Sequence, residues 1–195
     1  LPFQLQEKQI KVKDANPISF QVKSTLHGPL MNDVIGGVAL DKPLSMSWVY
    51  TQRPNKVLNA LYSISHAVDK NSFKAALPNI HAPGLNVMYG DSEGNIAWWA
   101  TAALYELPSG TSSKFVLDGS TAAQEKLRFT DFSENPMSEN PPWNYVYSAN
   151  NAPLFPSGKT YPGYYLPENR AKRIVQLLDP KSDWDKSSVS EMILD

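Results

Sequence analysis

The 195-residue sequence has no cysteine. This absence excludes a disulfide framework, a thiolate zinc site, an iron–sulfur cluster and a cysteine nucleophile within the chain. Cytosolic and exported proteins both occur without cysteine, so the redox compartment stays open. Histidine is scarce as well. The three histidines, His27, His66 and His81, do not have the spacing of a metal site. We therefore expect neither a metal centre nor a Ser–His–acid triad inside this chain.

The chain also lacks an excess of charge of either sign and lacks long hydrophobic runs. Eighteen Lys and Arg residues against 19 Asp and Glu residues give a net charge of −1. Without a basic run, we expect no nucleic-acid partner. The longest apolar stretches, residues 34–40 and 97–104, are far shorter than the ~20 residues that span a bilayer, so no membrane span is expected. The composition, 42% hydrophobic and 19% charged, is that of a globular domain with few surface charges.

The first part of the chain, residues 1–53, alternates apolar and polar side chains. Residues 3–13 and 18–23 follow this period of two, and the turn residues from Asp14 to Pro17 lie between them. The pattern predicts a β-hairpin. Two further short strands are expected, at 34–40 and 45–50, which makes this part an antiparallel meander.

The period then changes to the three- and four-residue steps of a helix. Residues 54–81 are predicted to be helical, with one helix from Pro54 to Val68 and a second that is capped by Ser72 and ends before Pro78. Residues 84–153 are predicted to be mainly β. They contain strands at 85–89, 95–100 and 145–147, and a long irregular loop at 106–142. Residues 166–195 are again helical, at 167–178 and 187–194. The whole chain is read as one α+β region in which antiparallel sheets are layered with helices.

Two short motifs suggest chemistry that their surroundings do not support. Residues 90–94 match the G-x-S-x-G pattern of a nucleophile elbow, but an elbow connects a strand to a helix, and Ile96 to Thr101 favour a strand. A hairpin turn is the preferred interpretation. Residues 157–160, Ser-Gly-Lys-Thr, resemble the end of a phosphate-binding loop, but Pro153 stands where that motif needs glycine. Nucleotide binding is rejected.

Aromatic residues leave one non-catalytic alternative, a secreted binding module with an aromatic ligand face. The candidates for such a face are Trp48, Trp98, Trp99, Trp143, Tyr164 and Tyr165. Neighbouring residues of a strand point to opposite faces, so Trp98 and Trp99 favour a strand that is covered on both sides over a flat binding platform.

Five segments, in this order and spacing, resemble the penicillin amidase (penicillin acylase) family. They are Thr-Leu-His-Gly-Pro-Leu at 25–30, Ser-Met-Ser-Trp at 45–48, Tyr-Gly-Asp-Ser-Glu-Gly-Asn-Ile at 89–96, Asn-Asn-Ala-Pro at 150–153 and Asn-Arg-Ala-Lys-Arg-Ile at 169–174. Members are N-terminal nucleophile hydrolases with an αββα sandwich. They are made as exported precursors that cleave themselves, so that a serine begins the large chain. The resemblance places these 195 residues in the middle of that large chain.

The resemblance implies roles for four residues. Asn150 corresponds to the asparagine of the oxyanion hole, and Arg170 to the active-site arginine that shapes the local electrostatics. Asn151 is a supporting neighbour that holds the backbone. His27 is either a supporting site residue or a structural histidine. No nucleophile is expected in this chain, because the side chain of Leu1 has no nucleophilic atom. In this family the serine's own α-amine serves as the general base, which fits the scarcity of histidine.

The resemblance also implies the activity, the partners and the location. The parent enzyme is expected to hydrolyse the amide of an N-acyl substrate, such as a β-lactam side chain or an acyl-homoserine lactone, in the periplasm or outside the cell. The expected partners are the rest of the precursor, namely the small chain and the start of the large chain, and a small-molecule acyl amide. The chain alone is expected to be inactive. No cofactor is expected, and calcium is doubtful because residues 155–161 carry no carboxylate.

Overall fold

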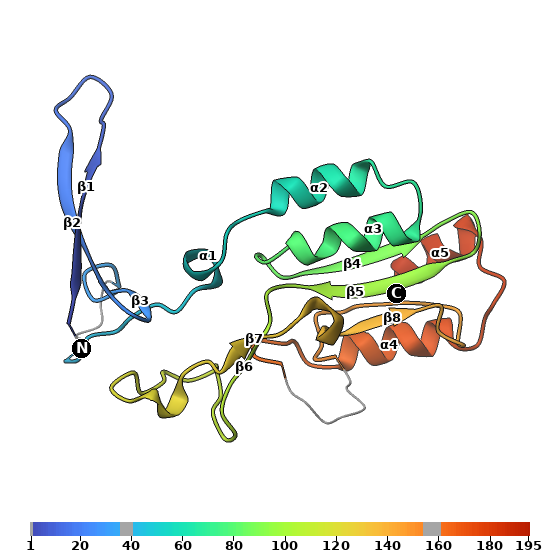
Figure 1. The fold of residues 1–195 in the computed structure, drawn as a ribbon. Helices are drawn as coiled ribbons and strands as arrows, with labels where there is room; N and C mark the ends of the chain where they lie inside the picture. The colour runs from blue at the N-terminus through green and yellow to red at the C-terminus, as the bar shows by residue number, and fades with distance from the viewer. Residues whose placement is uncertain (1, 36–40, 154–160) are drawn as a thin grey trace.

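The computed structural model describes residues 2–35, 41–153 and 161–195 of the chain. These residues form an N-terminal arm and a layered body of helices and strands, joined by an extended segment that holds a short helix (Figure 1). The fold is α+β, and its sheets are built from antiparallel strands, as the sequence predicts.

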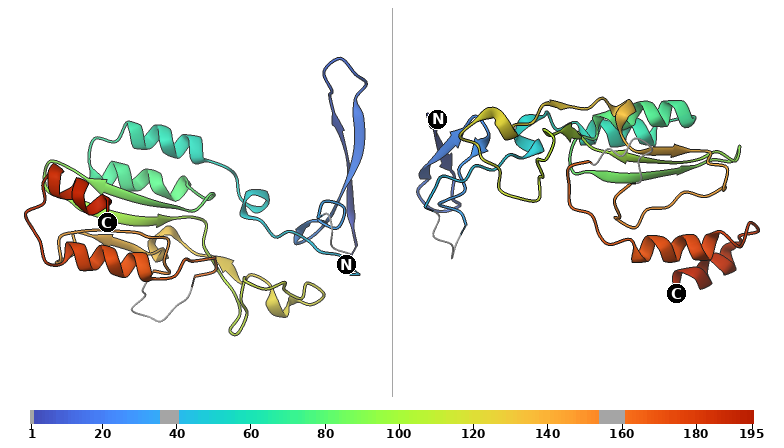
Figure 2. Two further views of the ribbon diagram at one scale, coloured as in Figure 1. Left: turned by 180° about the vertical axis from the view of Figure 1, so that it is seen from behind. Right: turned by 90° about the horizontal axis from the view of Figure 1, so that it is seen from below.

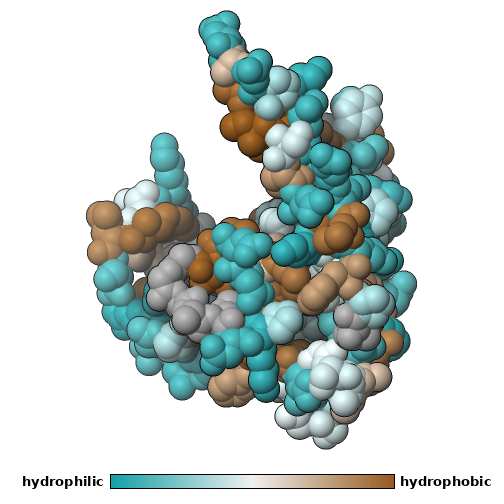
Figure 3. Space-filling model, turned by 90° about the vertical axis from the view of Figure 1, so that its left-hand side faces the viewer, coloured by the Kyte–Doolittle hydropathy of each residue, from teal (hydrophilic) through white to brown (hydrophobic). Residues whose placement is uncertain are grey.

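The arm is the predicted β-hairpin. Strand β1 (Gln4–Ile10) pairs antiparallel with β2 (Ile18–Thr25), and Glu7 lies opposite Gln21. A two-residue strand, β3 (Gly28–Pro29), pairs with the end of β2. The register places a set of apolar side chains on one face of the arm, namely Ile10, Ile18, Phe20 and Val22. Figure 3 shows hydrophobic residues along one side of the arm, and Phe20 is 42% exposed.

Of the two strands predicted after the hairpin, the one at 45–50 is not formed, and most of the one at 34–40 lies outside the described residues. Val34 and Ile35 lie in a turn in which both N–H groups donate to the carbonyl of Met31, at 2.9 and 3.0 Å; residues 36–40 lie outside the described residues. The segment predicted as a strand at 45–50 makes one isolated bridge between Ser45 and Leu30, and then enters helix α1 (Val49–Gln52). The prediction at 45–50 was wrong because six residues are too few to distinguish a strand from the start of a helix.

The helical part forms two packed helices, α2 (Val57–Ser65) and α3 (Lys70–Ala76). The cap of α3 corrects one prediction. Asp69, and not Ser72, is the N-cap, and the Asp69 carboxylate accepts a hydrogen bond from the Ser72 N–H at 2.7 Å. The Ser72 hydroxyl accepts in return from the Asp69 N–H at 3.1 Å. This reciprocal pair is a capping box, so Ser72 stands in the first turn of the helix.

The central sheet has three antiparallel strands in the order β4-β5-β8. Strands β4 (Leu85–Gly90) and β5 (Ile96–Thr101) form a hairpin in which Val87 faces Trp99. Strand β8 (Met137–Glu139) pairs with the other side of β5. The predicted irregular loop therefore supplies a sheet strand, which local sequence could not reveal because its partner lies about 40 residues earlier in the chain.

The rest of that loop is also partly ordered. It contributes a short ribbon of β6 (Tyr105–Glu106) and β7 (Arg128–Phe129), together with 3₁₀ turns at Ala122–Gln124 and Phe132–Glu134. Another 3₁₀ turn, Leu77–Asn79, follows α3 and contains Pro78.

Helices α2 and α3 cover one face of the central sheet, and the core lies between them (Figure 1). Its buried members are Ala60, Leu77, Ile80, Ala97 and Trp99. Helices α4 (Asn169–Leu178) and α5 (Lys186–Ile193) lie on the opposite side of the sheet (Figure 2). Both helices were predicted to within two residues at each end.

Candidate active site

The candidate site is built at the end of an extended segment that runs from Tyr145 to Asn151. No backbone ladder is assigned to residues 145–149 within the part of the chain that the structure describes, so the strand predicted there is not formed. Ala149 is buried, with 2% of its surface exposed, whereas Asn150 is exposed. The exposed Asn150 therefore follows directly after a buried residue, Ala149.

Asn150 has a left-handed backbone, with φ at 61°. Asparagine adopts this conformation more readily than most residues, but the turn still needs support. The Leu166 N–H donates to the Asn150 carbonyl at 2.7 Å, and Asn151 forms a parallel bridge with Leu166. The Asn151 side chain accepts from the Ala149 N–H at 3.3 Å and donates to the Ala152 carbonyl at 3.2 Å. Asn151 thus braces the backbone on both sides of Asn150.

Arg170 holds the side chain of Asn150. One guanidinium nitrogen, Nη2, donates to the Ala149 carbonyl at 2.6 Å and to Asn150 Oδ1 at 3.0 Å. A guanidinium has donors and no acceptor, so the amide atom that faces Arg170 must be the oxygen. The Nδ2 group of Asn150 then points away from Arg170. Among the described residues, no acceptor bonds to Nδ2. This amide can therefore donate two hydrogen bonds to a ligand.

The position of Arg170 is electrostatically unusual. It is the second residue of α4, whose N-terminus carries partial positive charge and disfavours a cation. The two carbonyl-type oxygens that Arg170 contacts offset this repulsion by accepting charge-assisted hydrogen bonds. A fixed positive charge is thus held next to the free amide of Asn150, where it would favour an anion.

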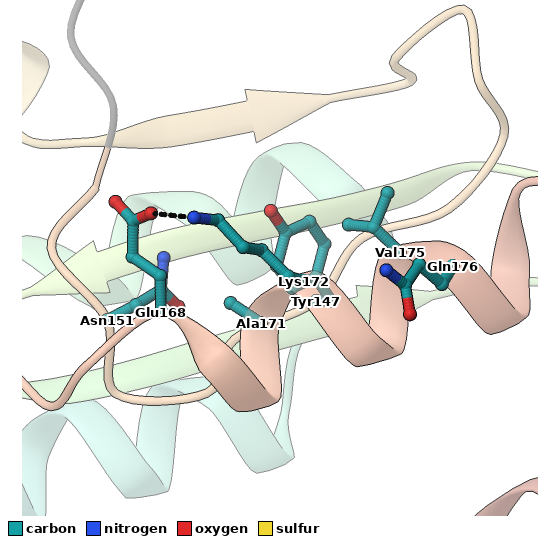
Figure 4. Close-up of a pocket in the computed structure, with 7 residues that line it drawn as sticks. All are labelled: Tyr147, Asn151, Glu168, Ala171, Lys172, Val175 and Gln176. Carbon is teal, nitrogen blue, oxygen red and sulfur yellow. Dashed lines mark ion pairs between the residues drawn. The ribbon is translucent and has the colours of Figure 1, made fainter.

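A shallow groove runs along α4 beside the site (Figure 4). Its volume is about 350 Å³, and it is lined by Tyr147, Asn151, Glu168, Ala171, Lys172, Val175 and Gln176. Glu168 and Lys172 form an ion pair of 3.1 Å at its rim. The groove borders Asn151 and not Asn150 or Arg170, so it lies next to the candidate site without containing it.

The structure does not bring His27 to this site. Its ring nitrogen Nε2 lies 3.2 Å from the Gly119 carbonyl, and its backbone N–H donates to the Thr25 hydroxyl. His27 lies between β2 and β3, and β3 is at the end of the molecule opposite α4 (Figure 1). Of the two interpretations open from sequence, this geometry favours the structural one.

The neighbouring tryptophans Trp98 and Trp99 do not share one face of β5. Trp99 is fully buried in the core, and the Trp98 indole on the other side of β5 donates to Asn86 Oδ1 at 2.9 Å. The prediction that these neighbours face opposite ways is confirmed. Trp48 and Trp143 are about half exposed. The opposite orientations of Trp98 and Trp99 do not favour a flat binding platform on β5.

The rejected elbow motif is a hairpin turn, as predicted. Asp91 Oδ1 accepts from the N–H groups of Glu93 and Asn95 at 3.0 and 2.9 Å, and the chain continues into β5 and not into a helix. The Ser-Gly-Lys-Thr motif at 157–160 lies outside the described residues.

Within the residues that are described, no group of three metal-ligating side chains is found. The expectation about calcium rests on the sequence alone.

One contact near the site was not predicted. The Tyr145 hydroxyl donates a hydrogen bond to Asp179 Oδ1, at the end of α4. The two residues are 34 positions apart and belong to different predicted elements. No local pattern in the sequence signals such a pair.

Comparison with known proteins assigns the family. The penicillin amidase family model matches residues 1–195. The chain belongs to the penicillin amidase family. Its fold agrees with this assignment: it matches a thermostable penicillin G acylase from Alcaligenes faecalis with a TM-score of 0.72 at 22% sequence identity, over 97% of this chain and 34% of that one.

Two curated relatives are acyl-homoserine lactone acylases named QuiP. The protein from Pseudomonas fluorescens is 27% identical over 164 residues, which cover 76% of this chain and 18% of the relative. The protein from Pseudomonas aeruginosa is 25% identical over 212 aligned residues, which cover 100% of this chain and 24% of the relative. The chain thus spans about a quarter or less of the length of these relatives.

No helix in the described residues is long and apolar enough to cross a membrane.

Proposed function

We propose that this chain supplies the oxyanion donor and the neighbouring arginine of an amidohydrolase. In this proposal a serine at the start of a longer chain, outside these 195 residues, attacks the amide carbonyl of an N-acyl substrate. The observation that carries the proposal is the side-chain geometry of the exposed Asn150: its oxygen accepts from Arg170, and no acceptor among the described residues bonds to its amide nitrogen.

Each residue would have a defined task. The α-amine of the serine would remove the hydroxyl proton, and the oxygen would bond to the carbonyl carbon, which places negative charge on the former carbonyl oxygen. Asn150 Nδ2 would donate to that oxyanion, and Arg170 would add positive charge beside it without moving. Donors of this kind are typically worth about 2.7–4 kcal/mol, or 10²–10³ in kcat. The proton would then pass from the amine to the leaving nitrogen, and water would release the acyl group from the serine.

The proposed substrate is an N-acyl amide of the acyl-homoserine lactone or acylated β-lactam type. The names of the curated relatives support the first class, and the name of the structural relative supports the second. We further propose that the protein acts in the periplasm or outside the cell, as expected from the family, and that the present chain is inactive alone. The rest of a precursor would be its partner.

The test is the intact mass and N-terminal sequence of the protein as its host makes it. The proposal predicts a chain that begins with serine and contains Asn150 and Arg170. A native product that begins at Leu1 and stays whole would contradict it, because no nucleophile would then precede the oxyanion donor. A second test assays the purified 195-residue chain with N-decanoyl-homoserine lactone and a chromogenic phenylacetyl anilide. Turnover that is abolished by Asn150→Ala would contradict the predicted inactivity of the chain alone.

A further inference from the structure

We infer that Tyr145 is a positioning residue, which fixes the place of Asn150 through its hydrogen bond to Asp179. The structural part of this inference concerns the described residues alone. Its catalytic meaning rests on the proposed function, in which Asn150 is the oxyanion donor.

The segment from Tyr145 to Asn150 is tied to α4 at both of its ends. Tyr145 bonds to Asp179, the residue that follows the last turn of the helix, and Asn150 bonds to Arg170 in the first turn. The nine helical steps between Arg170 and Asp179 span about 14 Å. The five steps between Tyr145 and Asn150 span about 16 Å when extended. These lengths match closely enough for both ties to form together, with the segment antiparallel to the helix.

The end of this segment next to Asn150 is also held by the Leu166 N–H bond to the Asn150 carbonyl and by the Arg170 bond to the Ala149 carbonyl. Within the described residues, 145–149 have no backbone ladder, so at the Tyr145 end the side-chain contact with Asp179 helps to decide where the segment lies against α4. A shift by one residue would turn each side chain to the other face of the extended segment. Such a shift would separate Asn150 Oδ1 from Arg170 and turn the free amide away from its present direction.

The bond at the far end joins the partly buried Tyr145 to the exposed carboxylate of Asp179. Asp179 lies at the C-terminal end of α4, where the helix dipole disfavours a carboxylate, so the hydroxyl of Tyr145 offsets a charge that the helix itself does not stabilise. Burial and the hydrogen bond to Asp179 raise the pKa of Tyr145 to about 12. The hydroxyl therefore stays protonated, and remains a donor, throughout the ordinary pH range.

The direct test is nuclear magnetic resonance on the 195-residue chain, which needs no activity. The side-chain amide signal of Asn150 is assigned by its loss in Asn150→Asp. In Tyr145→Phe this signal should shift, and the amide exchange of Leu166, which bonds to the Asn150 carbonyl, should speed up about tenfold. Asp179→Ala should reproduce both changes. Asp179→Asn keeps an acceptor oxygen for the hydroxyl, so it should preserve the original signals.

The matched control is Tyr147→Phe, which removes the same atom from a tyrosine two residues away whose ring lies 6.2 Å from that of Tyr145. It should leave the Asn150 signal in place. An unchanged Asn150 signal and unchanged Leu166 exchange in Tyr145→Phe would overturn the inference. If Tyr145→Phe loses the core Trp99 signal and so fails to fold, the comparison of Asp179→Asn with Asp179→Ala decides, and equal spectra for those two would overturn it.

A kinetic experiment separates this inference from the proposed function. It uses the full-length protein that we propose, with N-decanoyl-homoserine lactone as substrate and Asn150→Ala as the reference. Tyr145→Phe should lower kcat about tenfold and leave KM within about twofold, because a misplaced donor weakens transition-state binding. If Asn150→Ala leaves kcat unchanged, the proposed function fails while the spectroscopic result stands. If Asn150→Ala lowers kcat and Tyr145→Phe does not, the positioning role is refuted.

Discussion

Glu139 links the buried indole of Trp99 to the lysines of α3, and replacing it should have a measurable effect on stability. Its Oε1 atom accepts a hydrogen bond from Trp99 Nε1 at 3.1 Å and from Lys74 Nζ at 2.5 Å, and Oε2 lies 3.8 Å from Lys70 Nζ. Trp99 has no exposed surface, whereas the Glu139 side chain is 26% exposed. The substitution Glu139→Ala therefore leaves a buried N–H group without its acceptor.

The expected magnitude follows from these contacts. An unsatisfied buried donor costs about 1–3 kcal/mol, and the loss of partly exposed ion pairs adds up to about 1 kcal/mol. For a chain of this length each kcal/mol lowers Tm by about 2–4 °C, so Glu139→Ala should lower Tm by roughly 2–16 °C. Glu139→Gln keeps an oxygen for the indole and should lower Tm by no more than roughly 4 °C.

Thermal unfolding followed by circular dichroism and by tryptophan fluorescence measures these changes. Glu93→Ala is the control, since Glu93 is exposed in the β4–β5 turn and its removal should change the free energy of unfolding by less than about 0.5 kcal/mol. Equal melting temperatures for Glu139→Ala and Glu139→Gln would show that the acceptor for the indole contributes nothing to stability.

The same site predicts a pH dependence. Burial opposes ionisation of Glu139, but the hydrogen bonds from Lys74 and Trp99 outweigh it and hold the pKa of Glu139 below its ordinary value. A carboxylate whose pKa is lowered by folding stabilises the fold above the unfolded pKa and loses that contribution as pH falls through the folded pKa. The stability gap between the wild type and Glu139→Gln should thus be largest near pH 7 and shrink below about pH 4.5. A gap that widens on acidification would contradict this assignment.

Three further changes test other parts of the fold. Asp69→Ala removes the N-cap of α3 and should lower Tm by roughly 2–4 °C in a melting experiment, whereas an unchanged Tm would show that the capping box adds nothing. Gly28→Ala would place a Cβ 2.1 Å from the Met46 carbonyl oxygen at a φ of +140°, and should cost at least about 1–3 kcal/mol locally, seen as faster amide exchange at Met46. Unchanged exchange there would argue against the close approach. The arm and α2 expose large apolar side chains, including Phe20 at 42% and Leu58 at 77%, so the isolated chain should self-associate; light scattering that reports a monomer across a concentration series would count against this.

Elements with long periodic patterns could be predicted from the sequence. The β1–β2 and β4–β5 hairpins combine alternation with clear turn residues, and helices α2 and α4 show helical spacing next to the proline residues Pro54 and Pro180. Short elements failed for physical reasons. Residues 45–50 contain too few positions to separate a strand from a helix, and β8 pairs with a strand about 40 residues away, so no local signal identifies it.

The candidate site could be predicted in part. The family resemblance indicates Asn150 and Arg170, and in the structure Asn150 Oδ1 lies 3.0 Å from Arg170 Nη2. Their spacing of 20 residues across two elements gives no contact prediction by itself. The left-handed backbone of Asn150 and the tie between Tyr145 and Asp179 depend on tertiary packing, which residue types alone do not encode.

The proposal that Asn150 donates to the oxyanion is tested by the kcat of Asn150→Ala in the full-length protein that we propose, measured with N-decanoyl-homoserine lactone. The account predicts that kcat falls by about 10²–10³ while KM changes little, because the lost interaction forms mainly in the transition state. A variant that retains the kcat of the wild type, with its N-terminal serine intact, would contradict the account.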